Sequence, residues 1–359
     1  MVLRTAETLL IASLGGVAFT LIGFPAGLIS GSLLGVAAAA LLGRPLMVPR
    51  QFSRVISVLV GISLGAVVTP ETLKGLAAFP VSIAVLAVAT ICMTLATTSY
   101  LRFVHQWDWQ TALFGASPGA LAQVMVLAAD YGADMRKIAI VQVMRVVVLT
   151  IGLPSGLAYF GLTATGAFLP RSSAGIASFT ELAILIAVST VTALVLMRLR
   201  FPGGLMFGAM LGSGVLHGAG FIDAVLPWWV AAAAVIGIGA VTGSRFANTD
   251  PLTLLRYLGA ALGSFAVAIS VASAFVLLLT TMLPVRIADV VVAFSPGAQD
   301  TMMVLALALH LDPIFVGAHH LSRYILVSLS IPLLARWLGP PAPPPVIERR
   351  PAERPTIED

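Results

Sequence analysis

The chain has 359 residues, of which 59% are hydrophobic and only 10% are charged, and its mean hydropathy is +1.03. A soluble domain carries about 25% charged residues, so this composition excludes an ordinary soluble enzyme or binding module. The net charge of +5 does not indicate nucleic-acid binding, because the arginines stand at the ends of apolar segments rather than among aromatic residues in a basic patch. We therefore expect a protein that crosses a lipid bilayer several times.

Apolar segments follow one another along the chain, and a segment of about 20 residues is long enough to cross a bilayer. Six lie in membrane repeat 1, residues 7–160, and six in membrane repeat 2, residues 176–338, with residues 161–175 as the linker. Residues 339–359 are rich in proline and charge, which predicts a disordered cytoplasmic tail. The expected segments are 7–23, 26–42, 53–68, 80–101, 110–129, 136–160, 176–198, 203–219, 228–243, 258–282, 288–310 and 314–337.

The two sets of segments are copies of one unit. The motif Ser-Pro-Gly-Ala stands at residues 117–120 and again at 295–298, 178 positions later. The motif Phe-Pro-(Ala/Gly)-Gly stands at 24–27 and at 201–204, each time followed by glycines spaced four apart. An ordered set of matches at one nearly constant offset indicates an internal duplication. Further pairs at this offset are Asp134 with Asp312, Gln142 with His320, and Arg145 with Arg323.

The distribution of lysine and arginine favours inverted repeats over parallel ones. If every segment crosses the membrane, the two sides carry 11 and 7 basic residues. If each Ser-Pro-Gly-Ala segment enters and leaves on the same side, one side carries 15 and the other only Lys74, Arg171 and Arg286. Cytoplasmic loops are enriched in basic residues. The prediction is an all-α polytopic membrane protein with two inverted repeats of five transmembrane helices plus one re-entrant or broken Ser-Pro-Gly-Ala segment each, and with both termini cytoplasmic.

Each Ser-Pro-Gly-Ala segment predicts a helix that begins inside the membrane. Proline is tolerated in a first helical turn, because its missing N–H would be unpaired there. Ser117 and Ser295 are the expected N-caps, and Gly119 and Gly297 would let a ligand or another backbone come close. The free N–H groups would face a cavity and favour an anion. The alternative is an ordinary transmembrane helix with a proline kink.

Arg145 and Arg323 lie deep in the last segment of each repeat, about 15 Å from its start and so near the middle of the hydrocarbon layer. A charge at that depth needs a partner in protein or water. Either these arginines bind an anion, with Gln142 and His320 one turn earlier on the same face, or they bond carbonyls exposed by the broken helix. Asp300 has no acidic counterpart in repeat 1. It would hold a coupling proton or cation, or neutralise Arg323, which is the role that we favour.

The remaining polar residues favour structure over catalysis. Asp134 and Asp312 precede the last segments and are expected N-caps, and the glycines spaced four apart predict tight helix packing. The single cysteine, Cys92, and the adjacent pair His319 and His320 do not form a metal-ligand pattern. We therefore expect no enzymatic activity, no catalytic residue, no metal and no cofactor.

The paired Ser-Pro-Gly-Ala segments, the Phe-Pro-(Ala/Gly)-Gly motifs and the Gln/His-x-x-Arg pairs resemble those of the bacterial AbrB-type membrane family, over about residues 7–338. Members of that family have an internal duplication, and some carry labels that name an ammonia monooxygenase or an AbrB family regulator. The resemblance implies a multi-pass protein of the bacterial inner membrane. It implies no ligand, and an oxygenase would need metal ligands that this sequence does not offer.

We predict a secondary transporter that carries a small, anionic organic solute by alternating access. Its partners would be the lipid bilayer, the solute and a coupling proton or cation, without nucleic acid, and a homo-oligomeric state is left open. The alternative is a membrane component that regulates gene expression by sensing a ligand or partner, without transport. The predicted substrate-binding residues are Ser117, Pro118, Gly119, Gln123, Gln142 and Arg145 in repeat 1, and Ser295, Pro296, Gly297, Gln299, Asp300, His320 and Arg323 in repeat 2.

Overall fold

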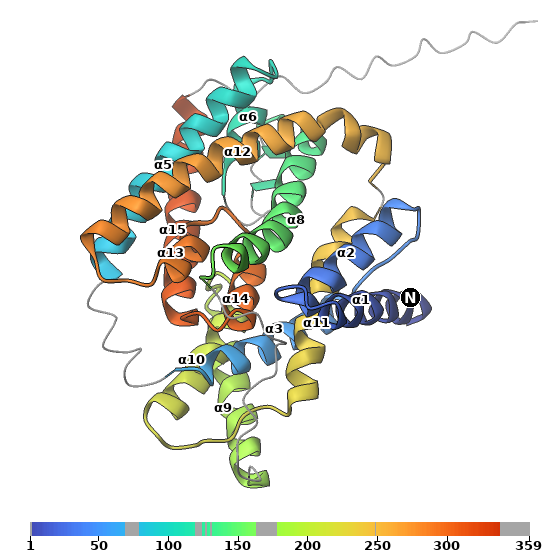
Figure 1. Cartoon of the computed structure of the whole chain (residues 1–359), viewed down its shortest axis with the longest axis vertical. Coiled ribbons are helices and arrows are strands. Elements are labelled where there is room, and N and C mark those ends of the chain that lie inside the picture. The colour runs from blue at the N-terminus through green and yellow to red at the C-terminus, as the bar shows by residue number, and fades with distance from the viewer. Residues whose placement is uncertain are drawn as a thin grey trace, which may run out of the picture.

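The computed structural model describes residues 2–68, 79–118, 124–125, 128–129, 131–162, 178–247 and 249–337. Over these ranges the chain is helical and forms no strand (Figure 1). Most of the predicted linker and all of the predicted tail lie outside the described residues, as do Gly119 and Gln123. The predicted boundaries of the two repeats and of the tail stay predictions.

The helices follow the duplication of the sequence. Helices α1, α2, α3, α6 and α8 have the same lengths as α9, α10, α11, α13 and α15, and each begins 177 or 178 residues before its counterpart. A short 3₁₀ helix, η2 (Ser244–Phe246), follows α11. The described helices of repeat 1 are α1 (Val2–Leu21), α2 (Gly27–Leu41), α3 (Arg50–Gly65), α5 (Phe79–Phe103), α6 (Trp109–Ala116) and α8 (Met135–Tyr159). Those of repeat 2 are α9 (Phe179–Arg198), α10 (Gly204–Gly218), α11 (Trp228–Gly243), α12 (Pro251–Met282), α13 (Ile287–Phe294), α14 (Gln299–Ala308) and α15 (Pro313–Trp337).

Six of the described helices are long and apolar enough to cross a membrane: α5, α8, α9, α11 with η2, α12 and α15. Helices α2 and α10 are also apolar, at 15 residues each. Large apolar side chains point outward from these helices, and Val191 and Leu277 are 59% and 62% exposed. Lipid solvates such a surface, whereas water does not. The prediction of a multi-pass helical membrane protein is confirmed at this level.

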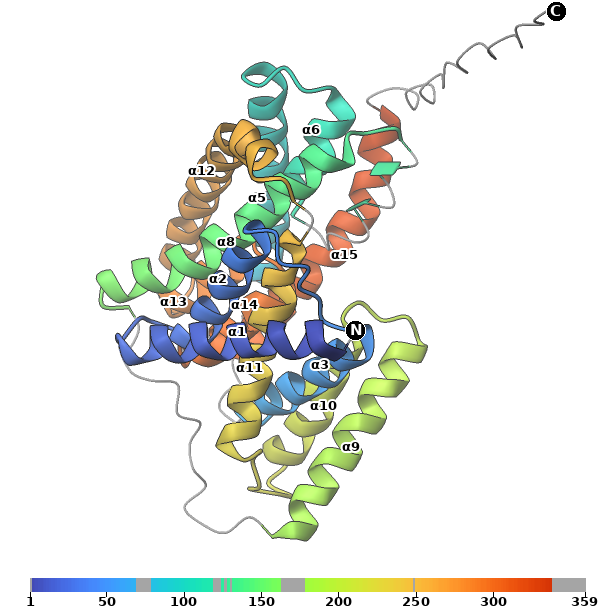
Figure 2. The same ribbon diagram turned by 90° about the vertical axis from the view of Figure 1, so that its right-hand side faces the viewer.

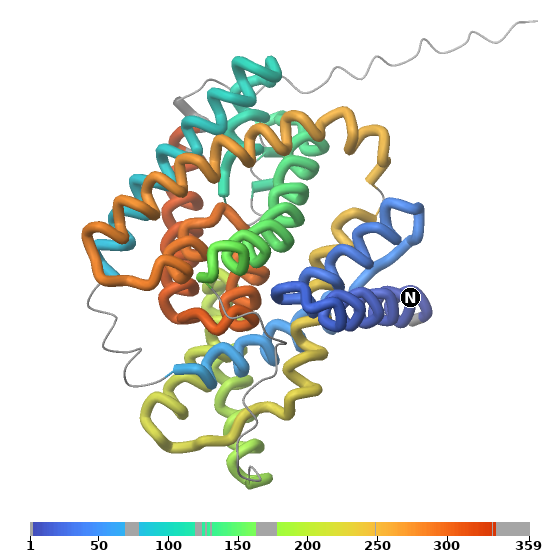
Figure 3. The backbone as a smooth tube through the Cα atoms, viewed as in Figure 1, coloured from blue at the N-terminus to red at the C-terminus, as the bar shows by residue number. Residues whose placement is uncertain are grey.

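The helices form two bundles, and each bundle contains helices of both repeats (Figures 1 and 2). Bundle A consists of α1, α2 and α3 packed with α9, α10 and α11, and bundle B consists of α5, α6 and α8 packed with α12 to α15. Helix α2 packs on α11 while α10 packs on α3, and α8 packs on α12 while α15 packs on α5. In each case, a helix of one repeat packs on the other repeat, and its counterpart makes the equivalent contact in the opposite direction. A two-fold axis that relates two copies produces such pairs of contacts. The chain path in Figure 3 shows that each bundle takes consecutive helices from each half of the sequence.

Glycines allow the helices of bundle A to approach closely, as the four-residue spacing predicts. A Cβ atom on Gly31 would lie 2.1 Å from the carbonyl oxygen of Gly15 in α1, and one on Gly208 would lie 2.5 Å from that of Thr192 in α9. Between the repeats, a Cβ on Gly61 would lie 2.3 Å from the carbonyl oxygen of Met206. Because these neighbours are backbone atoms, the space for a larger side chain is absent.

The segment between α12 and α15 is broken and turns back inside the protein. Helices α13 and α14 are separated by residues 295–298 and have 8 and 10 residues, so each is about 12–15 Å long, or half of a hydrocarbon layer. Asp289, in the first turn of α13, accepts a hydrogen bond at 2.9 Å from the N–H of Asp312, which directly precedes α15. The start and the end of the segment therefore lie side by side.

Repeat 1 closes its corresponding segment with the same contact. The N–H of Asp134 donates to Oγ1 of Thr111 in α6 at 2.9 Å, and both residues lie 178 positions before their counterparts. Asp134 also accepts from the N–H groups of Arg136 and Lys137 at the start of α8. Asp312 accepts from those of Ile314 and Phe315. Both aspartates are N-caps, as predicted.

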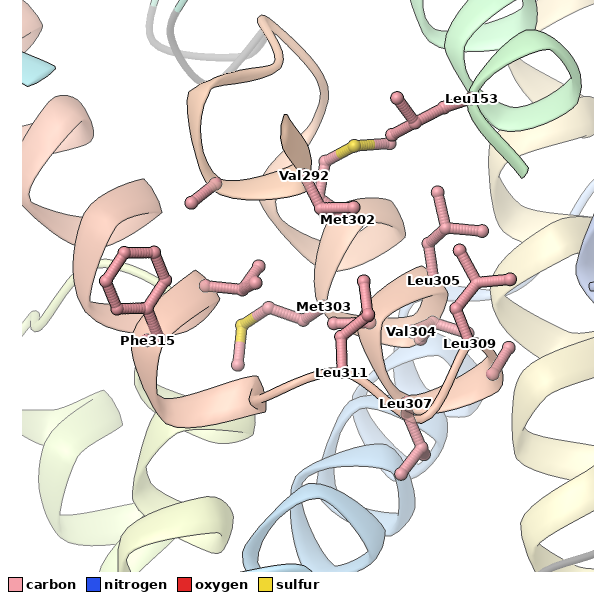
Figure 4. Close-up of a cluster of buried hydrophobic side chains, with 14 of the residues drawn as sticks. Leu153, Val292, Met302, Met303, Val304, Leu305, Leu307, Leu309, Leu311 and Phe315 are labelled. Atoms are coloured by element: carbon pink, nitrogen blue, oxygen red, sulfur yellow. The ribbon is translucent and has the colours of Figure 1, made fainter. Parts of the chain in front are cut away.

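Helix α14 lies inside the protein rather than at its surface. Its residues from Thr301 to Ala308 are all buried, and Val304 and Leu305 are fully enclosed. Figure 4 shows these side chains packed with Leu153 of α8, Leu311 and Phe315. A helix that is apolar on all sides is expected in such a position. The N-terminal turn of α14 is thereby held at the junction of bundles A and B, where α14 packs on α3 and α11.

Candidate functional site

A cavity of about 260 Å³ lies where the two bundles meet. Bundle A contributes Gly203, directly before α10, and Arg245 of η2. Bundle B contributes the remaining lining residues from the breaks after α6 and α13 and from α8, α14 and α15. These are Pro118, Gln142, Val143, Arg145, Val146, Gly297, Ala298, Gln299, Asp300, His320, Arg323 and Tyr324.

The serines of the two motifs end helices instead of starting them. Ser117 and Ser295 are the C-caps of α6 and α13, and their hydroxyl groups donate to the carbonyl oxygens of Leu113 and Val291 at 2.6 Å. A serine bonds the carbonyl four residues back in this way, and the proline that follows disfavours helical backbone at the serine. Helix α14 begins only after Ala298, whose side chain offers no cap. The prediction of a helix break was right, and the prediction that the serines are N-caps was wrong.

The helix that ends at Ala116 leaves carbonyl groups without a helical partner, and α8 supplies donors for them. Nε2 of Gln142 donates to the carbonyl oxygen of Phe114 at 2.9 Å. Nη1 and Nη2 of Arg145 donate to those of Ala116 and Ser117 at 3.4 and 3.3 Å. Gln142 and Arg145 are only 3% and 6% exposed, so water offers little replacement for these bonds.

Repeat 2 has the same arrangement 178 positions later. His320 of α15 bonds the carbonyl oxygen of Val292 through Nε2 at 3.2 Å, and Nη1 of Arg323 donates to that of Phe294 at 3.3 Å. Nη2 of Arg323 also contacts Nδ1 of His320. This pattern assigns the proton of a neutral imidazole to Nε2, because Nδ1 accepts from the guanidinium. Both arginines therefore have the structural role that was one of our two interpretations.

These contacts leave positive charge at the cavity. In the described part of the chain, neither Arg145 nor Arg323 has a carboxylate within 4.0 Å, and the buried Nε of Arg145 has no hydrogen-bond partner. The carbonyls at a helix C-terminus carry only about half an elementary charge. Two guanidinium groups on two such termini thus remain positive overall. Anion binding by these arginines stays a prediction.

Asp300 does not pair with Arg323, contrary to the role that we favoured. Its electrostatic partner is Arg245 of η2, which is exposed where it lines the cavity. Across the described ranges, Asp300 has no basic group within 4.0 Å, so the two opposite charges interact through space rather than in a direct ion pair. The sequence prediction missed Arg245. At the repeat offset, Val67 corresponds to Arg245 and Ala122 corresponds to Asp300. Two opposite charges that occur in repeat 2 and have no counterpart in repeat 1 are the signal by which the sequence could have revealed Arg245.

Gly203 is a second lining residue that the sequence prediction missed, because its motif was used there only as evidence of the duplication and of the family resemblance. Its φ is +61°, and a Cβ atom there would lie 2.5 Å from Nε2 of Gln299 at the start of α14. The corresponding residue of repeat 1, Ala26, has a φ of +52°. The Phe-Pro-Gly-Gly motif thus places backbone of bundle A against the N-terminal turn of α14.

The predicted residues fall into three groups. Ser117, Ser295 and Pro296 are buried and do not line the cavity, while Gly119 and Gln123 lie outside the described residues. Within the described ranges, no group of three or more His, Cys, Asp or Glu side chains is placed to hold a metal ion. The structure brings together Pro118, Gln142, Arg145, Gly297, Gln299, Asp300, His320 and Arg323.

The model of a family described as "Transition state regulatory protein AbrB" matches residues 28–339, from α2 to the end of α15. The chain belongs to this AbrB family. It is 27% identical over 349 residues to "Putative regulator AbrB" of Escherichia coli strain K12, covering 95% of this chain and 98% of the relative. It is 25% identical over 351 residues to "Uncharacterized protein YhjN" of Bacillus subtilis strain 168, covering 91% of both. The family resemblance in the sequence motifs is confirmed.

Replacing Arg145 by Met removes the donors for two buried carbonyls and keeps an unbranched side chain at this position of α8. We expect the free energy of unfolding to fall by about 1–3 kcal/mol, which thermal unfolding of the protein in detergent would register as a lower midpoint. Arg54→Met is the matched control, because Arg54 is exposed on α3. An unchanged midpoint for Arg145→Met would mean that these carbonyls do not depend on the arginine.

Proposed function

We propose that this AbrB family member is a secondary transporter that carries a small organic anion across the bacterial inner membrane. The observation that carries the proposal is the charge of the cavity between the bundles. Among the described lining residues are three guanidinium groups, those of Arg145, Arg245 and Arg323, and one carboxylate, that of Asp300. An excess of fixed positive charge around a cavity attracts an anionic ligand.

The size and the donors of the cavity indicate the class of anion. Sites for drug-sized ligands enclose about 300–1,000 Å³, so a cavity of about 260 Å³ suits a small solute. Guanidinium groups bind carboxylates with two parallel hydrogen bonds. Val143 and Val146 add apolar surface to the lining. A short-chain carboxylate fits these features best.

The broken segments support an inverted orientation of the repeats, because a hydrogen bond joins the two ends of each segment. A segment whose two ends are joined by the bond between Asp289 and Asp312 enters and leaves on one side of the membrane. With α1, α2, α3, α5 and α8 as the crossings, repeat 1 crosses an odd number of times, so repeat 2 starts on the opposite side. The distribution of basic residues favours the same topology, with both termini cytoplasmic. Inverted repeats with broken helices at the midplane are typical of secondary transporters.

Movement of one bundle against the other provides a route for alternating access. Within each bundle the helices pack extensively along their lengths, whereas bundle A meets bundle B mainly through α14 and α8. The cavity lies at this junction and receives residues from both sides. A rotation or shift between bundles would open it toward one side of the membrane and then the other.

A regulatory role is the second candidate, and the name of the Escherichia coli relative favours it. In that case the same cavity would bind an anion and change the contacts of the protein with a partner, without carrying solute. Binding and flux therefore have to be measured separately.

The opposed orientation of the repeats predicts which loops lie on the same side. In a Cys92→Ser background, a membrane-impermeant maleimide added to intact cells should label Arg286→Cys but not Arg136→Cys or Arg44→Cys. If all segments crossed, Arg136→Cys would be labelled instead of Arg286→Cys. Arg44→Cys serves as the cytoplasmic reference in both topologies, and permeabilised cells provide the control for reactivity.

The proposed anion site predicts that an Arg245→Gln variant binds the anion more weakly than the wild type. Acetate, lactate, succinate and citrate are first tested for their effect on thermal unfolding of the purified protein, and uptake of a stabilising anion is then measured in proteoliposomes. Because Arg245 forms no hydrogen bond with the described residues, its replacement should spare the fold. Loss of a charge-assisted bond of about 1.5–3 kcal/mol reduces affinity about 10- to 100-fold.

Arg256→Gln is the matched control for this measurement, because Arg256 is exposed at the start of α12, away from the cavity lining. Unchanged uptake by Arg245→Gln would contradict the assignment of the site. A stabilising anion that produces no flux would favour the regulatory role.

A further inference from the structure

Arg245 and Asp300 form a pair of opposite charges that spans the two bundles. Arg245 belongs to η2 of bundle A, and Asp300 lies in the first turn of α14 in bundle B. Both side chains line the same cavity and interact electrostatically. Within the described part of the chain, neither side chain forms a hydrogen bond or a direct ion pair, so no contact there occupies the polar atoms that a ligand would use.

This pair is an addition to an otherwise symmetric framework. The bonds of Gln142 and Arg145 to the end of α6 recur as those of His320 and Arg323 to the end of α13. No such recurrence exists for Arg245 and Asp300, whose counterparts at the repeat offset are Val67 and Ala122. The framework contacts hold both broken helices in place without this pair. The pair is therefore not needed to hold the fold, and it gives repeat 2 two charged side chains that repeat 1 lacks at the same positions.

Arg245 differs from the other two arginines of the cavity in that its Nη atoms bond no carbonyl of the described residues. Arg145 and Arg323 direct their Nη atoms at backbone carbonyls, which they must satisfy whether or not a solute is present. An anion entering the cavity therefore meets in Arg245 a guanidinium whose present compensating charge is Asp300. Binding of the anion to Arg245 would place a second negative charge beside the carboxylate of Asp300 and engage the guanidinium that compensates it, which favours the neutral form of the carboxyl group.

We propose that Asp300 takes up a proton when an anionic solute binds Arg245, so that solute and proton cross the membrane together. This inference rests on the proposed function and adds the coupling ion to it. The proton moves from water to a carboxylate oxygen of Asp300 and returns to water when the solute leaves and Arg245 again compensates the carboxylate. No other bond is formed or broken.

The other titratable groups of the cavity do not take this role. Arg145 comes from α8, and His320, Arg323 and Tyr324 come from α15, while α3 and α11 place no side chain in the lining. The hydrogen-bond pattern of His320 already requires its neutral form, with both ring nitrogens engaged. Asp300 is the one carboxylate among the described lining residues.

The net charge of the empty and the loaded site determines how the membrane potential acts on transport. Beside Arg145 and Arg323, which are the same in both states, the empty site contains Arg245 and ionised Asp300, and the loaded site contains Arg245, the anion and protonated Asp300. For a monovalent solute both sites carry the same net charge, so the membrane potential acts equally on the movement of the empty and the loaded protein. The transport cycle is then an electroneutral symport.

The first test needs no solute and uses infrared spectroscopy of the purified full-length protein. Arg245→Gln removes the charge that compensates Asp300, so we expect an additional protonated-carboxyl band at neutral pH. The band should be absent from the double variant Arg245→Gln/Asp300→Asn and from Arg245→Lys, which keeps the positive charge. An Arg245→Gln spectrum without this band, or a band that persists in the double variant, would overturn the proposal.

The second test measures proton uptake with a pH indicator when methanesulfonate, a small organic anion that does not titrate, is added to the protein. Wild type should take up protons, Asp300→Asn should take up none, and the exposed-site control Arg256→Gln should behave like wild type. Methanesulfonate that raises the unfolding temperature without proton uptake would sink the coupling but leave the anion site standing. The absence of both effects would count against the proposed function itself.

Discussion

The structure depends on one constraint: a helix that ends inside the protein leaves backbone carbonyls without a helical partner, and buried side chains have to satisfy them. In both repeats the last helix meets this need with two residues one turn apart, Gln142 and Arg145 in α8, and His320 and Arg323 in α15. Four buried polar side chains thus fix the two broken segments. The same choice of residues brings two guanidinium groups to the centre of the protein, where dipoles of the helix ends compensate them only in part.

The position of the cavity follows from this arrangement. The ends of α6 and α13 meet α8 and α15 at Arg145 and Arg323, and the cavity lies beside them, at the junction of bundles A and B. Residues of both bundles contact α14 at this place. Its apolar body is enclosed by the core shown in Figure 4, and Gly203 of bundle A leaves room for Gln299 at its first turn. Among the described lining residues, Arg245 and Asp300 then add to this symmetric framework a pair of opposite charges that links the bundles across the cavity.

Sequence patterns predicted the helical membrane class, the duplication, the break at Ser-Pro-Gly-Ala and the caps Asp134 and Asp312, because each depends on local chemistry or on comparison of the two halves. The serines were misassigned because a serine at a helix end can either cap the N-terminus of the following helix or bond a carbonyl of the preceding one. The proline that follows each serine disfavours helical backbone at the serine, so the preceding helix ends there. The partner of Asp300 was misassigned because Arg323 belongs to the next helix of the same repeat, and the sequence does not show which other helices pack nearby. Arg245 lies 55 residues away in the other bundle, and only the packing of α14 on α11 brings the two charges to one cavity.

Exposure of the cavity to each side of the membrane in turn is the central claim, and Val143 offers a direct reporter of it. Val143→Cys in a Cys92→Ser background can be treated with an impermeant thiol reagent from either side of oriented membrane vesicles. Alternating access predicts reaction from both sides, because the lining residue faces each side during part of the cycle. Reaction from one side only, with or without an anion that binds the protein, would contradict transport through this cavity.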